Sequence, residues 1–151
     1  MVPAELELEV TESVVQTDQR NLSIFQDLKD LGILLAIDDF GTGYSSFASL
    51  KHLKVDCLKI DKYFVDDMLV DKKALFLVGS MVEMGPKLGY GIIAEGVEKS
   101  EQLDILKNLG CETAQGYLFS KPVNANAISK LLNSTCWLLP RTSLMDARED
   151  S

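Results

Sequence analysis

Two kinds of segment alternate along the chain when its hydrophobic and polar positions are compared. Short, mostly apolar runs predict β-strands, and longer runs with apolar residues three or four positions apart predict helices. Strands are predicted over residues 6–10, 34–40, 55–60, 92–94 and 113–119. In the first of these, glutamates alternate with apolar residues, which predicts a strand with two chemically different faces.

Helices are predicted between and after these strands. The first has its apolar residues between 22 and 31 and should end at Gly32, because glycine adopts the backbone conformation that follows a helix. A short helix is predicted over 45–53, and a final one over 124–132.

Two further helices carry stronger local signals. A long helix is predicted over 72–88, with Phe76 among the residues that face the core. Pro86 should kink this helix or end it early, because proline removes a backbone donor. Another helix should be capped by Ser100 and ended by Gly110.

The alternation predicts an α/β protein with five parallel β/α units, because parallel strands need helical crossovers. Such units build either a doubly wound sheet or a (βα)8 barrel. A complete barrel needs about 250 residues, and the chain has 151. The pattern leaves both architectures open. Residues 1–136 are expected to form one domain, and residues 137–151, where the periodicity is lost, a frayed tail.

Composition narrows the classes of partner. The net charge of −8 argues against a broad basic face for a nucleic acid polymer. It permits an anionic ligand if divalent cations lie between carboxylates and phosphates. No apolar stretch is long enough to span a membrane, and no signal peptide is visible. Three cysteines without a CxxC spacing argue against a disulfide framework or a zinc site, and a cytoplasmic protein is expected.

Polar side chains fall at the end of each predicted strand. They are Glu9, Asp38 with Asp39, Lys59, Glu95 with Glu98, and Gln115. In parallel α/β folds, the carboxyl ends of the strands share one rim, where groups from different strands meet. Carboxylates gathered there would repel one another without cations, and oxygen ligands suit Mg²⁺ or Mn²⁺. Paired ions of this kind can promote in-line attack on a phosphodiester.

Each of these features also has a plain structural interpretation. Glu5 can lie on a solvated strand face, and the pair Asp38–Asp39 can cap a turn. Lys59 can extend outward to water, Glu95 to Glu98 can form an ordinary turn, and His52 can lie on a helix surface. The joint pattern favours a site, because five successive strands end in this way.

Five ordered motifs resemble the later signature motifs of the EAL-domain phosphodiesterases, which cleave cyclic di-GMP to linear pGpG. They are Glu9-Val10-Thr11-Glu12, Asp38-Asp39-Phe40-Gly41-Thr42-Gly43-Tyr44-Ser45-Ser46, Leu58-Lys59-Ile60-Asp61, Ala94-Glu95-Gly96-Val97-Glu98 and Gln115-Gly116-Tyr117-Leu118-Phe119-Ser120-Lys121-Pro122. The resemblance implies an incomplete TIM-like (βα) barrel, in which the five β/α units correspond to strands 4–8.

The resemblance also implies roles for individual residues. Glu9, Asp38, Asp39 and Glu95 match acids of the metal site. Lys59 matches a catalytic lysine that holds and polarises the attacking water. The implied activating ions are Mg²⁺ or Mn²⁺, with Ca²⁺ as an inhibitor.

Other matches surround this centre. Gln115 matches a catalytic glutamine that helps to position the water, and Glu98 an acid that supports the substrate region. Glu12 resembles an acid that braces the loop joining active-site closure to dimerisation. That loop, residues 40–46, contains Phe40, Gly41, Thr42 and Gly43.

One departure from the family pattern is plain. The Glu-Ala-Leu motif, whose glutamate binds a metal, and a further asparagine ligand have no counterpart in the chain. The chain is therefore expected to be a C-terminal portion of the domain and inactive alone, with cyclic di-GMP as ligand and either a homodimer or a separate N-terminal half-barrel as partner. The alternatives are a non-catalytic cyclic di-GMP receptor or dimerisation module, and a stand-alone α/β protein with unrelated metal chemistry.

Overall fold

A computed structural model describes residues 2–16, 19–43 and 54–133 of the chain. The chain divides between Leu118 and Phe119 into two compact units. The first contains a five-stranded sheet and its helices, and the second contains helix α7 (Ala125–Asn133). The boundary predicted after residue 136, the short helix predicted over 45–53 and the tail predicted over 137–151 lie outside the described residues.

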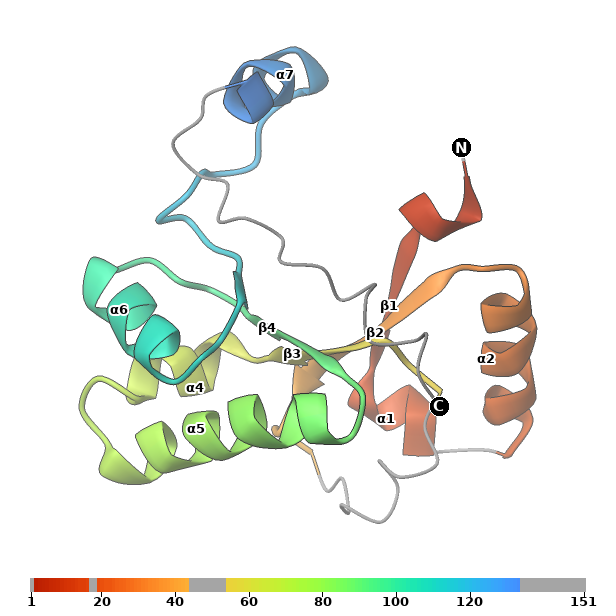
Figure 1. The fold of residues 1–151 in the computed structure, drawn as a ribbon, viewed down its shortest axis with the longest axis horizontal. Coiled ribbons are helices and arrows are strands. Elements are labelled where there is room, and N and C mark those ends of the chain that lie inside the picture. Colours follow the sequence, from red (N-terminus) through yellow and green to blue (C-terminus); the bar gives the residue numbers. More distant parts are fainter. Residues whose placement is uncertain (1, 17–18, 44–53, 134–151) are drawn as a thin grey trace, which may run out of the picture. The chain divides into compact units, whose positions relative to one another are not determined.

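The sheet consists of parallel strands in sequential order (Figure 1). They are β1 (Glu7–Thr11), β2 (Leu34–Phe40), β3 (Cys57–Ile60), β4 (Gly91–Ala94) and β5 (Thr113–Ala114). A doubly wound sheet reverses its strand order at a switch point, whereas a barrel adds each strand beside the last. The order therefore confirms the predicted parallel α/β fold and identifies it as a segment of a barrel. Among the described strands the barrel is not closed, since β1 and β5 each pair on one side only.

The core lies between one face of this sheet and its helices. Helix α2 (Gln19–Asp30) lies beside β2, whereas α4 (Lys62–Asp67), α5 (Lys72–Lys87) and α6 (Ser100–Asn108) follow β3 and β4 (Figure 1). Alternate strand residues are buried under these helices: Leu35, Ile37, Leu58, Ile60, Ile92 and Ala94. Because strand side chains alternate, the residues between them lie on the other face, which carries the candidate site.

Several element boundaries differ from the sequence predictions. β5 ends at Ala114 and not at Phe119. The backbone at Gly116 approaches Val97 so closely that an added Cβ would lie 2.1 Å from the Val97 carbonyl oxygen. The chain turns there, and Val97 donates its backbone N–H to Gln115 and accepts one from Leu118. This approach between distant segments is not visible in the local pattern.

The two detailed helix predictions were also wrong in part. α5 continues through Pro86 to Lys87, because proline in the last turn costs few backbone hydrogen bonds. Phe76 is 74% exposed and does not face the core. Ser100 is the first residue of α6 and not its cap; the side chain of Gln102 accepts the backbone N–H of Lys99 instead.

Two short helices were not predicted. They are α1 (Glu12–Gln16) and α4, each too short to show a helical period. A 3-10 turn, η1 (Pro3–Glu5), precedes β1. None of the described helices combines the length and apolarity needed to cross a membrane.

Candidate active site

A buried lysine at the end of β3 is the centre of the site. The side chain of Lys59 is 3% exposed, and its ammonium nitrogen lies 2.6 Å from Glu9 Oε1, 2.7 Å from Glu95 Oε1 and 3.4 Å from Asp38 Oδ1. These acids come from β1, from the turn after β4 and from β2. Four neighbouring strands therefore bring together residues that the sequence separates widely, as parallel register at one rim requires.

The charges of this cluster do not balance. Three carboxylates surround one ammonium, and Asp38 Oδ1 is buried without a hydrogen bond despite its distance to Lys59. Burial alone lowers the pKa of Lys59, but the hydrogen bonds that it donates to Glu9 and Glu95 and the negative charges of Glu95 and Asp38 outweigh it, so that its pKa is raised. Lys59 therefore stays charged and acts as a donor, not as a base.

Glu95 behaves differently. Its burial raises its pKa, the charge of Lys59 lowers it, and the negative charge of Asp38 raises it again, with a raised pKa as the result. A carboxylate with a raised pKa is a stronger base near neutral pH. The cluster thus places the Lys59 ammonium beside a carboxyl group whose pKa is raised.

Asp39 has an unusual backbone and an acidic neighbour. Its φ of 55° lies in the left-handed region, which is uncommon for a residue other than glycine. Its pKa is raised by burial, by a hydrogen bond with Asp61 and by the charges of Asp38 and Asp61. Asp61 also caps α4, accepting the N–H of Tyr63 at 2.8 Å. Sequence reasoning did not assign Asp61 to the site, although its place directly after β3 was the available signal.

The loop after β2 begins against Glu12. This side chain is 4% exposed, and its Oε2 accepts the backbone N–H groups of Gly41 at 3.1 Å and Gly43 at 3.4 Å. A Cβ on Gly43 would lie 2.6 Å from Glu12 Oε1, so a larger residue there would displace the Glu12 carboxylate. Thr42 donates its hydroxyl to the Asp39 carbonyl at 2.8 Å, and the neighbouring Phe40 is buried. Residues 44–46 of the predicted loop lie outside the described part.

Two predicted residues lie at the margin of the cluster. Glu98, three residues after Glu95, forms a solvent-exposed ion pair with Lys62 at 3.0 Å. Gln115 directly follows β5; its backbone pairs with Ala94 and Val97, and the residue is exposed. The structure therefore brings Glu9, Asp38, Glu95 and Lys59 into contact, with the other predicted residues adjoining them in the sequence or on neighbouring strands.

The donor set fits a hard divalent cation. All ligand atoms that these acids offer are oxygens, the buried Asp38 Oδ1 makes no hydrogen bond, and the acids outnumber the ammonium. Within the described ranges, no three His, Cys, Asp or Glu side chains stand together as a ready metal cage. The Lys59 ammonium is what lies between Glu9, Asp38 and Glu95.

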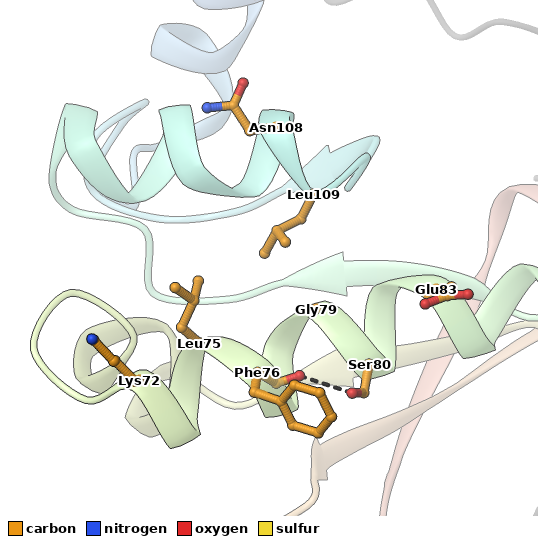
Figure 2. A pocket seen from close by; sticks show the side chains of 8 residues that line it. All are labelled: Lys72, Leu75, Phe76, Gly79, Ser80, Glu83, Asn108 and Leu109. Carbon is orange, nitrogen blue, oxygen red and sulfur yellow. Dashed lines mark hydrogen bonds between the residues drawn. The ribbon is translucent and has the colours of Figure 1, made fainter.

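A surface depression lies away from the lysine–carboxylate cluster. It is an open depression between α5 and α6, and Figure 2 shows its lining. Leu75, Phe76 and Leu109 supply its apolar surface, while the Ser80 hydroxyl donates to the Phe76 carbonyl at 2.8 Å. None of its lining residues belongs to the lysine–carboxylate cluster, so this depression is not part of the candidate active site.

Fold and site together define a barrel segment with an acid–lysine cluster at its strand ends. Comparison with protein families gives this class a name: the model described as "EAL domain" matches residues 1–122. The chain belongs to the EAL domain family. This confirms the resemblance seen in the five motifs.

Curated relatives agree with the family. The chain is 40% identical over 130 residues to "Cyclic di-GMP phosphodiesterase NbdA" of Pseudomonas aeruginosa. This match covers 85% of this chain and 17% of NbdA. It is also 40% identical over 131 residues to "Oxygen sensor protein DosP" of Escherichia coli. That match covers 86% of this chain and 16% of DosP. The chain therefore spans less than a fifth of the length of these relatives.

Solved structures share the fold. The "PaMucR Phosphodiesterase, c-di-GMP complex" superposes with a TM-score of 0.80 at 40% identity, over 85% of this chain and 52% of that one. BlrP1 of Klebsiella pneumoniae, solved with manganese and cyclic di-GMP and also with calcium, gives a TM-score of 0.76 at 35% identity, over 81% of this chain and 31% of that one. These matches confirm the TIM-barrel-like fold.

Proposed function

We propose that this chain supplies the lysine–carboxylate side of a metal-dependent site that hydrolyses cyclic di-GMP to linear pGpG. One observation carries the proposal: Lys59 lies buried among Glu9, Asp38 and Glu95 where neighbouring parallel strands end. Relatives named as cyclic di-GMP phosphodiesterases support the substrate, and BlrP1 structures with manganese or calcium support a divalent ion.

The acids would hold the metal. Glu9, Asp38, Asp39 and Glu95 are the ligands we propose for Mg²⁺ or Mn²⁺, with Ca²⁺ as an inhibitor. When bound, such an ion supplies positive charge that stabilises the charged transition state of phosphoryl transfer. Asp39 lies beside Asp38 in the sequence, and relief of the repulsion that raises its pKa is a further reason for a cation to bind there.

The protein's own groups would then act on water and phosphate. Water attacks phosphorus, the bond to the 3′-oxygen breaks, that oxygen takes up a proton to become a hydroxyl, and a terminal 5′-phosphate remains. Lys59, held charged by its neighbours, donates hydrogen bonds that orient the water and stabilise negative charge on the phosphate oxygens. Glu95, whose carboxylate lies 2.7 Å from the Lys59 ammonium, holds this group in place beside the metal. We propose that Gln115 helps to position this water and that Glu98 and the Glu12-braced loop, residues 40–46, support the substrate.

Chromatography of the nucleotide products tests the proposal. The 151-residue polypeptide is incubated with cyclic di-GMP and Mn²⁺, by itself and fused to the remaining part of an EAL domain taken from a relative. We expect little pGpG from the polypeptide alone, because two ligands of the family's metal site have no counterpart in it, and clear turnover from the completed domain. A completed, folded domain that binds cyclic di-GMP without metal and forms no pGpG would contradict catalysis and favour a receptor.

A further inference from the structure

A fully buried glutamine lies behind the turn that carries Glu95. Gln102 sits in the first turn of α6, and its side chain is 0% exposed. Glutamine is seldom fully buried unless its polar atoms are satisfied. Its position therefore calls for an account of each hydrogen bond it makes.

The amide of Gln102 joins two segments that are far apart in the sequence. Its Oε1 accepts the backbone N–H groups of Glu98 at 2.8 Å and Lys99 at 2.9 Å. Its Nε2 donates to the Val65 carbonyl at 3.3 Å and to Asp66 Oδ1 at 2.8 Å, both near the end of α4. Both acceptor positions and both donor hydrogens are used, so the side chain has one orientation.

The turn from Glu95 to Glu98 is anchored on two further sides. Glu95 donates its backbone N–H to Ile60 of β3 at 3.0 Å, and Val97 donates to Gln115 at 3.0 Å. These bonds fix the start and middle of the turn against the strands. Gln102 fixes its end against α4, which begins directly after β3.

A second set of contacts, at the surface, also joins the Glu95–Glu98 turn to α4. Lys62 pairs with Asp66 at 3.1 Å and with Glu98 at 3.0 Å, and Asp66 in turn accepts from Gln102. Gly96, with φ of +66°, lies so close to Lys62 that a Cβ would approach its Cγ to 2.3 Å. The turn therefore has little freedom. Of the side chains that bond to it, Lys62 is partly exposed, whereas Gln102 is fully buried.

We propose that Gln102 is a positioning residue for Glu95: by holding the Glu95–Glu98 turn against α4, it keeps the Glu95 carboxylate on the Lys59 ammonium. The inference rests on the proposed function only for the consequence that this carboxylate takes part in hydrolysis. Groups that orient a functional side chain through hydrogen bonds commonly matter nearly as much as that side chain. Gln102 itself touches no reacting atom.

The ammonium signal of Lys59 in nitrogen-15 NMR spectra of the full chain tests this inference without metal or nucleotide. The signal is assigned from its loss in Lys59→Arg, and Glu95→Gln gives the shift produced when the carboxylate is removed. Gln102→Asn shortens the side chain by one methylene, so that it no longer reaches both segments. We expect this variant to move the Lys59 signal in the same direction as Glu95→Gln does. We also expect exchange of the Glu98 and Lys99 amides to quicken about tenfold, as for a lost hydrogen bond.

Gln26→Asn is the matched control, because Gln26 bonds to Asp30 on α2, away from this turn. It should leave the Lys59 signal unchanged. If Gln102→Asn does not fold, Gln102→Met, which keeps the length without the amide, provides the same measurement. A folded variant with fast exchange at Glu98 and Lys99 but a wild-type Lys59 signal would overturn the inference and leave Gln102 as a helix cap. Because no turnover is measured, that result is distinct from failure of the proposed hydrolysis.

Discussion

Lys59 shows which features of the site can be predicted from single residues and which cannot. Its apolar stem continues the pattern of β3, and from the sequence it could equally have extended to water. The structure buries it and gives it three acidic neighbours, none of them close in the sequence. The residue types of the site could be predicted from their places at strand ends, whereas their pairing could not, because it depends on the register between strands. The same holds for Asp61, whose contact with Asp39 appears only in three dimensions.

Replacing this lysine should cost stability as well as chemistry. Lys59→Ala leaves Glu9, Asp38 and Glu95 without their counter-charge. We expect a loss of about 2–3 kcal/mol in the free energy of unfolding, below the value for fully buried pairs because Glu9 is half exposed. Urea denaturation at pH 7 measures it. Lys62→Ala is the control, since its partners are exposed and its loss should stay below about 1 kcal/mol. Equal losses in both variants would contradict the account.

Cys57 offers a pH-dependent test at the other end of β3. Burial, followed by the charges of Glu7 and Asp56, raises the pKa of its thiol to about 11. The thiolate is the reactive form, so in a chain with Cys111 and Cys136 replaced by serine, the alkylation rate at pH 8 should be low. It should rise about tenfold per pH unit until pH ~11. Because the folded state holds the proton that the unfolded state releases near pH 9, stability should fall as the pH rises from 9 to 11. A rate that levels off near pH 9 would show an ordinary thiol.

At the scale of elements, the sequence patterns succeed where local chemistry decides and fail where packing does. The apolar runs of β2 and β4 and the ends of α2 and α6 at Gly32 and Gly110 were predicted, because strand formers and positive-φ glycines act locally. β5 was predicted too long because its end depends on contact between Gly116 and Val97. α5 passes through Pro86 because its last turn needs few further backbone bonds.

Two glycines of α5 give a matched test of this packing. A Cβ on Gly85 would lie 2.3 Å from the Ile92 side chain, so Gly85→Ala should lower stability by about 1–3 kcal/mol through overpacking. A Cβ on Gly79 would lie 3.2 Å from Leu109, which lines the open depression in Figure 2 and has room to move. Gly79→Ala should therefore be neutral, or stabilising by up to about 1 kcal/mol from helix propensity. Thermal unfolding measures the stability of both variants. Similar melting temperatures would contradict the close contact described between Gly85 and Ile92.

At the scale of the whole molecule, the sequential strand order joins the fold to the proposed chemistry. A barrel gathers the carboxyl ends of all its strands at one rim, and β1 to β3 and the turn after β4 supply Glu9, Asp38, Lys59 and Glu95 to it. The chain covers about half of the MucR structure that it resembles. Its acids and lysine are thus one part of a rim, and a completed domain is the proper object for measuring turnover.

The decisive experiment on the proposed metal site compares manganese-dependent formation of pGpG by such a completed domain and by its Asp39→Asn variant. Asparagine tolerates the positive φ and removes the repulsion with Asp38 and Asp61, so the variant should be at least as stable as the wild type. Its kcat/KM should fall by about a hundredfold or more, as for loss of a charge that supports the transition state. Asp104→Asn on the exposed face of α6 should keep full activity. Near-normal turnover by Asp39→Asn, or pGpG formed by the wild type with all divalent ions chelated, would contradict the proposed metal site.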